Sequence, residues 1–423
     1  MDGNIIKNFN ELAATSNRRL ALEIIEAGAL AINTTKVVKD SLVLKDNILH
    51  LKDEEFDLSK FKNIKVVGFG KSSVEAALAL EDILGSKITT GAVIGLEKAD
   101  TKYIQTFSGT HPHPSEANVP AGHRIYDIVT NSTEEDLIIA LVSGGGSALL
   151  CYPESEYMEG AKLYESFLKA GKTISDMNTV RKHLSLLKGG GLAKAAFPAT
   201  IVGLIFSDVP GNAFENVASG PTYKDNTTIE DAQKIITDNE LGSFNLVETP
   251  KEDKYFTKVH NFVLVSNTTA IETMANKARE FGLESKILST DLYDKTDTAI
   301  EKIFSAAKKN SVVLAAGETS VSVPKNPGRG GRNLHMGIEV IRTGKIKDDS
   351  VFVAYASDGM DNSDAAGAIV DKSSNEKMEK LGLNPTDYAE RFDSYNFFQK
   401  TGDMIITGPT GANVSDIMLL LCK

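Results

Sequence analysis

Short apolar segments alternate with helix-like segments through the first half of the chain. Apolar residues spaced three and four apart indicate helices at 10–34, 72–84, 121–130 and within 159–194. Runs rich in β-branched residues indicate strands at 64–67, 91–96, 137–142 and 200–206. Strands that are apolar on both faces and separated by helices are typical of a parallel sheet covered by helices. We therefore predict a doubly wound, Rossmann-like α/β fold for this half.

A polar, acidic stretch follows, and we expect the domain boundary near residues 235–258. Beyond it we expect helices at 269–281 and 296–308, and strands at 262–265, 286–288, 312–315, 321–323, 351–355 and 404–407. The close spacing of several of these strands favours a mixed sheet. The predicted domains are 1–245 and 255–423, both α/β, with the last helix a candidate to pack back on the N-terminal domain.

Composition and charge exclude several classes of protein. The 423 residues are 41% hydrophobic and 24% charged, which is ordinary for globular domains. A net charge of -11 argues against nucleic-acid binding. The longest apolar runs are far shorter than the roughly 20 residues of a membrane-spanning helix. The N-terminus does not resemble a secretory signal, and Cys151 and Cys422 lie in no disulfide or zinc pattern, so we expect a cytoplasmic protein.

Polar, glycine-containing turns follow three of the predicted strands, where open α/β sheets bind ligands. The turn at 68–73 contains Lys71 before a predicted helix, a candidate anion site. This turn matches neither a Walker A loop nor the complete dinucleotide fingerprint. We interpret the turn at 143–147 as a phosphate cradle, with a plain tight turn as the alternative. A solvated lysine is the alternative for Lys71.

Three further residues of the first half are candidates because of their neighbours. Asp208 follows the strand at 200–206 and could hold Mg²⁺ or accept a proton, although a lone aspartate in a turn is more often a cap. Asn178 and Arg181 share the polar face of a predicted helix. For Arg181, a phosphate-facing and a solvated position both remain open.

In the second half, polar residues and glycines are concentrated at 317–319 and 328–333. Arginine side chains match phosphate and carboxylate oxygens, and glycines let the backbone approach a ligand closely. Two interpretations are open. The segment is either a binding site that contains Glu318, Arg329 and Arg332, or a mobile glycine-rich hairpin. Asp358 follows the strand at 351–355 within a carboxylate-rich segment that does not match an EF-hand loop.

Ten ordered motifs extend over nearly the whole chain and resemble those of the glycerate 2-kinase family, whose C-terminal part is the MOFRL domain. They are GFGKSS (68–73), GTHPHPSEANV (109–119), LVSGGGSALL (141–150), MNTVRKHLSLLKGGGLA (177–193), SDVPG (207–211), SGPT (219–222), GETSVSV (317–323), GRGGRN (328–333), SDGMDNSDAAGA (357–368) and TGPTGANVSD (407–416). The resemblance implies ATP-dependent phosphorylation of D-glycerate at its 2-hydroxyl, giving 2-phosphoglycerate and ADP, with Mg²⁺ or another divalent cation. It also implies an active site in the cleft between two α/β domains.

The resemblance and the residue chemistry together give the candidate site residues. The catalytic candidates are Lys71, Asp208, Glu318 and Arg332, with Asp208 also the metal-ligand candidate. The cofactor-binding candidates are Ser143, Gly144, Gly145, Gly146, Ser147, Asn178 and Arg181. The substrate-binding candidates are Lys71, Arg329, Arg332 and Asp358. The loop before Gly328 is longer than in the family, so the division of roles between Arg329 and Arg332 stays open.

Two alternatives to the kinase function stay open. One is a hydroxypyruvate reductase, which the incomplete dinucleotide fingerprint at 68–73 does not support. The other is a non-catalytic nucleotide-binding or sugar-acid-binding protein, which would not need both carboxylates and both basic groups. The expected partners are ATP and D-glycerate, and we expect binding neither to nucleic acid nor to a membrane. Assembly into a homo-oligomer stays open.

Overall fold

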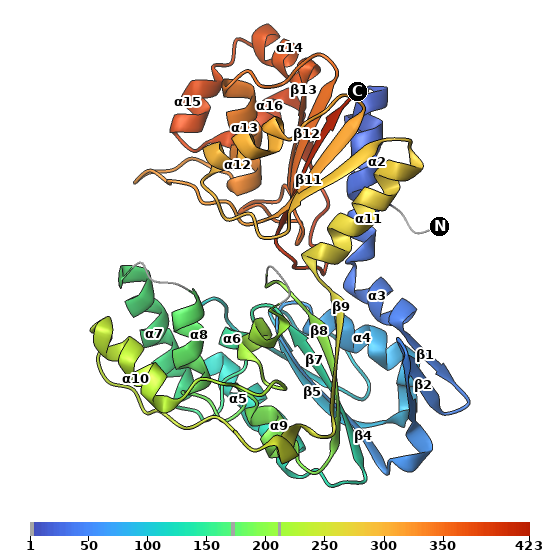
Figure 1. Ribbon diagram of the computed structural model, residues 1–423, viewed down its shortest axis with the longest axis vertical. Helices are drawn as coiled ribbons and strands as arrows, with labels where there is room; N and C mark the ends of the chain where they lie inside the picture. Colours follow the sequence, from blue (N-terminus) through green and yellow to red (C-terminus); the bar gives the residue numbers. More distant parts are fainter. Residues whose placement is uncertain (1–3, 171–173, 210–212) are drawn as a thin grey trace. The chain divides into compact units, whose positions relative to one another are not determined.

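The computed structural model describes residues 4–170, 174–209 and 213–423. The chain divides into two compact units (Figure 1). Unit 1 joins the N-terminal segment up to Asn33 with Ser266–Lys423, and unit 2 is Thr34–Val265. Both units are α/β, the first half of the chain with a parallel sheet and the second with a mixed one, so the predicted fold class is confirmed.

This division differs from the predicted domains 1–245 and 255–423. The N-terminal helix α2 (Ser16–Ala31) belongs to unit 1, because it packs on α11 (Asn267–Glu280). A Cβ atom on Gly28 would lie only 2.6 Å from Met274 Cγ, which shows how close the two helices are. The buried Arg18 guanidinium also pairs with Asp371 (2.9 Å) and Asp403 (2.8 Å).

Unit 2 is built on a six-stranded sheet with the order β6-β5-β4-β7-β8-β9, in which all neighbours are parallel. Its strands are β4 (Asn63–Phe69), β5 (Ile88–Gly95), β6 (Gln105–Ser108), β7 (Asp136–Ser143), β8 (Thr200–Phe206) and β9 (Val259–Val265). In the register, Phe69 pairs with Val142 and Val142 pairs with Ile205. The carboxyl ends of β4, β7 and β8 are therefore level, and the polar turns that follow these strands lie at the same edge of the sheet.

Helices cover both faces of this sheet, and a small antiparallel sheet of β1 (Leu42–Lys45), β2 (Ile48–Leu51) and β3 (Glu54–Asp57) extends unit 2 (Figure 1). The helices are α3 (Thr34–Ser41), α4 (Ser73–Leu84), α5 (Val119–Thr130), α6 (Gly146–Leu149), α7 (Glu156–Ala170), α8 (Ile174–Lys182), α9 (Gly191–Ala196) and α10 (Ile229–Asp238). Helices α7, α8 and α10 form a group with a core of its own, which includes Leu163, Val180 and Ile236. This second core supports α8 and the candidate residues on it.

Unit 1 contains a six-stranded mixed sheet with the order β10-β11-β15-β12-β13-β14. Its strands are β10 (Glu284–Ser289), β11 (Ser311–Gly317), β12 (Ser350–Ala356), β13 (Gly367–Asp371), β14 (Met404–Ile405) and β15 (Asp416–Cys422). The segment predicted as strand 321–323 is a loop instead, because it is largely exposed and pairs with no described strand. The chain ends in a strand and not in the predicted last helix, since the apolar run of β15 is buried at the centre of the sheet between β11 and β12.

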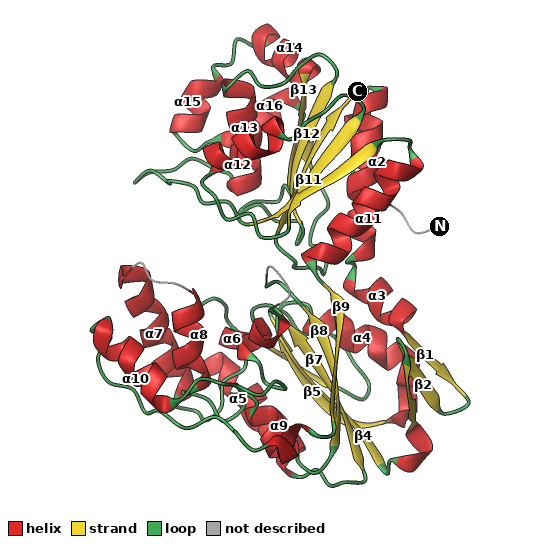
Figure 2. Ribbon diagram, in the orientation of Figure 1, coloured by secondary structure: helices red, strands yellow, loops and turns green. Residues whose placement is uncertain are grey.

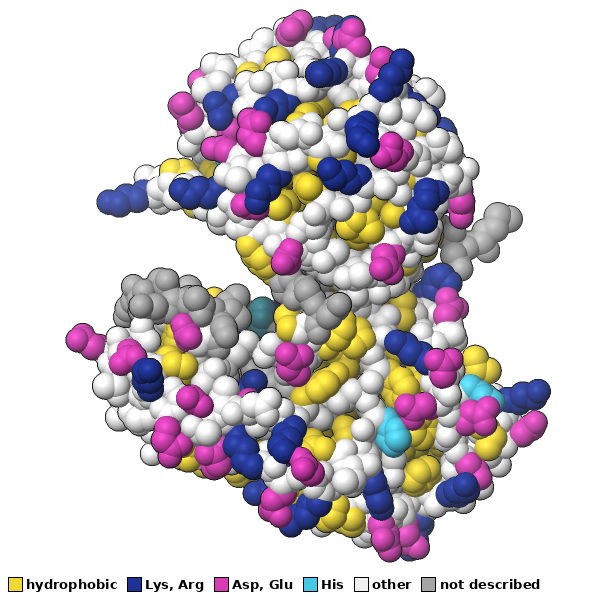
Figure 3. All heavy atoms as spheres, viewed as in Figure 1, with side chains coloured by type: hydrophobic (Ala, Val, Ile, Leu, Met, Phe, Trp, Pro, Cys, Tyr) yellow, Lys and Arg dark blue, Asp and Glu magenta, His cyan; other side chains and the backbone are white. Residues whose placement is uncertain are grey.

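The helices of unit 1 lie on both faces of its sheet (Figure 2). Helices α2 and α11 pack on one face, and α12 (Thr296–Ser305), α13 (Arg332–Arg342) and α16 (Ser394–Thr401) lie on the other, with α14 (Lys372–Lys380) and α15 (Pro385–Glu390) beside them. The remaining helix, α1 (Phe9–Leu12), precedes α2. None of the helices in the described residues is long and apolar enough to cross a membrane. On the face drawn in Figure 3, basic and acidic side chains are mixed over each unit.

Candidate active site

The turns that follow β4 and β7 in unit 2 are tied together by hydrogen bonds. Lys71 N donates to Gly144 O (2.8 Å), and Ser72 N donates to Ser143 Oγ (3.1 Å). Gly70 has a φ of 120°, and a Cβ atom there would lie 2.2 Å from Ser143 Oγ. Glycine at this position therefore allows both a left-handed backbone and the close approach of the two turns.

The turn Ser143–Ser147, called the glycine turn below, also lies against the loop that follows β8. A Cβ atom on Gly144 would lie 2.1 Å from Asp208 Oδ2, and one on Gly146 would lie 2.6 Å from Ala218 Cβ. Gly145 has a φ of 81°. The sequence predicted a turn that needs close backbone approach, and the partners of that approach include the Asp208 carboxylate. Residues 210 and 211, which complete the predicted motif at 207–211, lie outside the described residues.

Two half-buried cations near the glycine turn have no ion-pair partner among the residues that the structure describes. A Cβ atom added to Gly145 would lie 3.2 Å from Lys71 Cγ. The charges of Lys71 and Arg181 both act on His111, which lies beside the same turn. Neither the Lys71 ammonium nor the Arg181 guanidinium forms a hydrogen bond or ion pair with another described residue. Burial lowers the pKa of Arg181, although the nearby charge of Glu156, which forms no ion pair with it, opposes the shift. A partly buried positive charge without an ion-pair partner favours the binding of an anion.

A chain of hydroxyl and amide groups connects the other candidates of unit 2. Ser147 Oγ and Ser219 Oγ are 2.9 Å apart, and Ser219 Oγ donates to Asn178 Oδ1 (3.3 Å). Asn178 and Arg181 lie three residues apart on α8, on one side of the helix. The structure therefore brings the cofactor-binding candidates of the glycine turn and of α8 into one region. The sequence contains no local signal that would assign Ser219 to this group.

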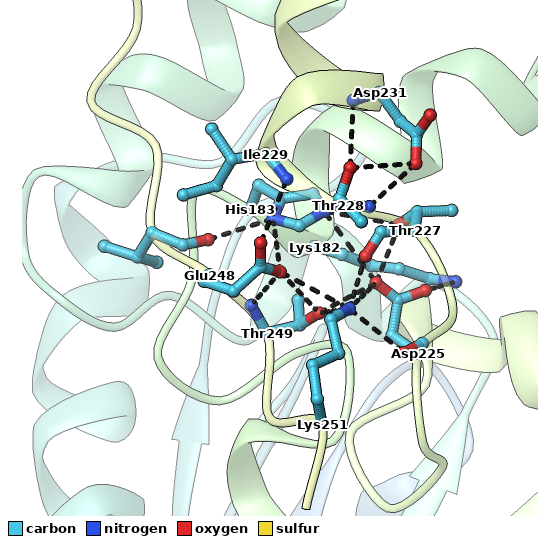
Figure 4. Close-up of polar contacts among 11 residues, drawn as sticks. Lys182, His183, Asp225, Thr227, Thr228, Ile229, Asp231, Glu248, Thr249 and Lys251 are labelled. Atoms are coloured by element: carbon cyan, nitrogen blue, oxygen red, sulfur yellow. Dashed lines mark hydrogen bonds and ion pairs between the residues drawn. The ribbon is translucent and has the colours of Figure 1, made fainter.

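Lys182, the residue after Arg181, is held by a buried network (Figure 4). Its ammonium donates to Asp225 Oδ1 (3.1 Å), and Asp225 Oδ2 accepts from Thr227 Oγ1 (2.7 Å) and Thr249 Oγ1 (3.0 Å). The Asp225 side chain is only 2% exposed. The hydroxyls and Lys182 hold the pKa of Asp225 below its usual value, against the opposing effect of burial. This network fixes the carboxyl end of α8 and so restricts the position of Arg181.

In unit 1, three separate segments meet at Arg332, the first residue of α13. Arg332 Nε donates to Asp416 Oδ2 (3.0 Å), and Nη1 forms an ion pair with Glu318 Oε2 (3.0 Å). Gly317 at the end of β11 pairs with Asp416 at the start of β15 in the antiparallel register. That register places Glu318 next to Asp416, so the strand topology builds the carboxylate pair that orients the guanidinium.

The carboxylates around Arg332 are unequal in burial. Asp416 is 7% exposed, and burial raises its pKa to about 7 although Arg332 opposes the shift. Asp361 is also buried, which raises its pKa, and it accepts hydrogen bonds from Asn333 N (3.0 Å) and Leu334 N (2.7 Å) at the start of α13. Asp361 and Asp416 are not among the site residues predicted from the sequence. The sequence signal for Asp416 is a polar Ser-Asp pair at the start of the final apolar run.

Arg329 has partners different from those of Arg332. Its guanidinium lies 3.6 Å from the centre of the Tyr395 ring, and it pairs with the exposed Asp364 at 2.6 Å. Asp358 Oδ1 accepts from Met360 N (3.0 Å), which is a local turn contact. Arg332 therefore pairs with Glu318, whereas Arg329 pairs with Asp364 and Asp358 accepts a hydrogen bond from Met360.

Comparisons with known proteins match both halves of the chain. A domain of unknown function (DUF4147) matches residues 20–249, and the MOFRL family matches residues 311–416. A glycerate 2-kinase from Pyrococcus horikoshii is 32% identical over 442 residues, covering 97% of this chain and 98% of the relative. This chain belongs to the glycerate 2-kinase family. The predicted resemblance is thereby confirmed.

Other relatives also cover most of the chain. A D-glycerate 2-kinase from Thermotoga maritima is 31% identical over 430 residues, covering 96% of this chain and 98% of its own. The crystal structure of a glycerate kinase from T. maritima superposes with a TM-score of 0.84 at 30% identity, over 96% of this chain and 99% of that chain. A relative from Agrobacterium vitis with the provisional name hydroxypyruvate reductase is 35% identical over 387 residues, covering 84% of this chain and 86% of its own.

Proposed function

We propose that this protein uses ATP to phosphorylate the 2-hydroxyl of D-glycerate, which produces 2-phosphoglycerate and ADP. The observation that carries the proposal is the pair of cations, Lys71 and Arg181, that lie by the glycine turn without an anionic partner among the described residues. Phosphoryl transfer depends on positioning and on neutralising charge that spreads over phosphate oxygens. The names of the relatives that span nearly the whole chain support the same reaction.

In this proposal unit 2 binds the phosphates of ATP. Backbone N–H groups of the glycine turn donate to phosphate oxygens, and Lys71 and Arg181 neutralise their charge. Ser147 and Asn178 are already joined through Ser219, which orients their polar groups before the nucleotide binds. Such preorganisation means that the groups need not be ordered at the moment of reaction.

Arg332 and its carboxylates, in unit 1, are the second group of candidates for this reaction. Glu318 and Asp416 hold Nη1 and Nε, and among the described residues no group accepts a hydrogen bond from Nη2. We assign Nη2 to the glycerate carboxylate or to the transferring phosphoryl group. Glu318 then acts by orienting the arginine. Arg329, which pairs with Asp364, and Asp358, which accepts from Met360 N, remain candidates for substrate binding.

A divalent cation such as Mg²⁺ would neutralise the ATP phosphates when bound. The described residues include no group of three or more His, Cys, Asp or Glu side chains arranged to hold a metal. In enzymes that use nucleotides, Mg²⁺ is usually held by one or two carboxylates together with the phosphates, so a single carboxylate beside a phosphate cradle fits this need. We assign Asp208, whose carboxylate lies against Gly144, as that ligand. The proposal keeps the cytoplasmic location that the sequence predicts.

The test compares two reactions of the purified protein. With ATP, Mg²⁺ and D-glycerate, we expect release of ADP that depends on D-glycerate and is abolished by Lys71→Met. With hydroxypyruvate and NADH or NADPH, we expect no oxidation of the cofactor. Oxidation of NADH or NADPH without release of ADP would show that the protein is a reductase and not a kinase. If neither reaction occurs and the protein still binds ATP measurably, the result would instead favour the non-catalytic binding protein.

A further inference from the structure

His111 lies in the loop that follows β6, at the same edge of the parallel sheet as the turns described above. The position of a Cβ on Gly145 is 3.1 Å from His111 Cδ2 and 3.3 Å from His111 Nε2. Lys71 Cγ is 3.2 Å from that position. The Cδ2–Nε2 edge of the imidazole and the stem of Lys71 are therefore neighbours over the middle residue of the glycine turn.

The loop on either side of His111 is firmly anchored. Asn118 is fully buried, its Oδ1 accepts from Thr110 N (2.8 Å), and its Nδ2 donates to Ala148 O (2.8 Å) at the end of the glycine turn. Thr110 Oγ1 donates to His113 O (2.7 Å). These bonds hold the residues next to His111 against α6, so the backbone that carries the ring is anchored beside the turn.

The imidazole itself has no such bond. Neither ring nitrogen of the half-buried His111 forms a hydrogen bond with another described residue. Burial, and then the charges of Lys71 from the loop after β4 and Arg181 from α8, lower its pKa to about 4. The adjacent glycine turn contains no titratable side chain. At neutral pH the ring is thus uncharged and offers one N–H donor and one acceptor among cations that attract an anion.

We infer that His111 is a third binding residue of this site, which donates a hydrogen bond from an uncharged imidazole to an oxyanion held by Lys71 and Arg181. The identity of the oxyanion rests on the proposed function: it is a phosphate of ATP or the carboxylate of D-glycerate. A neutral donor adds a directed hydrogen bond without adding a third positive charge to the pair of cations. This explains why a polar ring occupies a place where it has no partner within the described protein.

His113 provides a matched control in the same loop. Its ring packs edge-to-face on Tyr164, with the ring centres 4.6 Å apart, and the residue is exposed. His111→Ala is expected to lower kcat/KM by about 10- to 100-fold, the effect of losing one hydrogen bond to a charged group. His111→Gln, which keeps an N–H donor, is expected to recover part of the loss, and His113→Ala to stay near the wild type. Kinetics with ATP and D-glycerate varied in turn identify the oxyanion by the substrate whose KM rises.

A second measurement does not depend on catalysis. Histidine ring signals of the full-length wild-type protein are followed by NMR against pH, alone and with inorganic pyrophosphate or D-glycerate. We expect the His111 signal to titrate near pH 4 in the free protein. Its pKa should rise when an anion binds, because the anion offsets the two cations, and this rise should be lost in Lys71→Met.

The two measurements separate failure of this inference from failure of the proposed function. If no ADP forms but pyrophosphate or D-glycerate still shifts the His111 signal, the anion site stands and the kinase proposal falls. If ADP forms while His111→Ala keeps wild-type kinetics and neither anion moves the His111 signal, the inference is overturned and the kinase proposal stands.

Discussion

Replacing Gly144 by alanine tests whether the fit of the glycine turn against Asp208 is needed for activity. The new methyl group would lie 2.1 Å from Asp208 Oδ2 and 2.8 Å from Asp208 Cβ. Rotation of the Asp208 side chain can remove the first contact but not the second, because the Cβ atom does not move on rotation. Ordinary contacts between carbon atoms are about 3.5–4.0 Å, so the turn or the loop after β8 must move by about 1 Å.

A shift of this size has different consequences for catalysis and for stability. A misplacement of about 1 Å in a catalytic site lowers the rate by about 100-fold. Overpacking at a single buried site typically destabilises a protein by about 1–3 kcal/mol, which a protein of this size tolerates. We therefore expect Gly144→Ala to be folded, with a modestly lower Tm and kcat/KM reduced by about two orders of magnitude. The assay is release of ADP with ATP and D-glycerate, together with a thermal melt.

Gly160→Ala serves as the matched control, because the same change is made within helix α7. Its Cβ atom would lie 3.3 Å from Pro114 Cγ, a contact that small adjustments relieve. Alanine also favours a helix over glycine by about 1 kcal/mol, so activity should be unchanged and the Tm equal or higher. A Gly144→Ala enzyme with kcat/KM within about threefold of the wild type would refute the reasoning, since a 1 Å shift at a catalytic turn should cost much more.

Three further predictions follow from other contacts. Arg332→Ala should lower kcat/KM by about 10³-fold or more, as loss of a charge-stabilising group does. Arg329→Ala should lower it by less than about tenfold, because that guanidinium forms its ion pair at the surface. Steady-state kinetics compare the two variants. The pKa of Asp416, raised to about 7, means that the folded protein keeps a proton which the unfolded chain releases near pH 4. Wild-type stability relative to Asp416→Asn should therefore fall as pH rises from about 4 to 7, by at most about 1.4 kcal/mol per pH unit, and urea titrations that show a rising difference would contradict this. Asp225→Ala leaves the Lys182 charge buried without its partner and should destabilise the protein by about 3–5 kcal/mol, measured by urea unfolding; an unchanged midpoint would rule out the buried network as a support of α8.

Local patterns were sufficient to predict the central strands of unit 2. The strand predicted at 262–265 in the second domain is instead β9 of this unit, and strands β1, β2, β3 and β6 were not predicted. The apolar run at 137–142 is the core of β7, and its level register with β4 and β8 follows from parallel pairing of equally buried strands. The glycine turn was predictable for the same reason, since three glycines after a buried strand indicate close backbone approach. Lys71 and Arg181 were recognisable as candidates, although only the structure reveals that both lack an anionic partner among the described residues.

Long-range partners were not predictable in this way. The periodicity of α2 predicts a helix but not that Arg18 pairs with Asp371 and Asp403, more than 350 residues away along the chain. The final apolar run has the length at which a buried strand and a buried helix cannot be distinguished by pattern. Its position between β11 and β12 brings Asp416 to Arg332, so the role of Asp416 depends on a strand order that the sequence does not contain locally.

The identity of the phosphorylated product tests the central claim most directly. Purified protein is incubated with ATP, Mg²⁺ and D-glycerate, and the product is examined by phosphorus–proton correlation NMR while ADP is quantified. We expect one ADP for each product molecule, with the phosphorus coupled to the single proton on C2, as in 2-phosphoglycerate. Phosphorus coupled to the C3 protons, or no ADP above the level without D-glycerate, would contradict it.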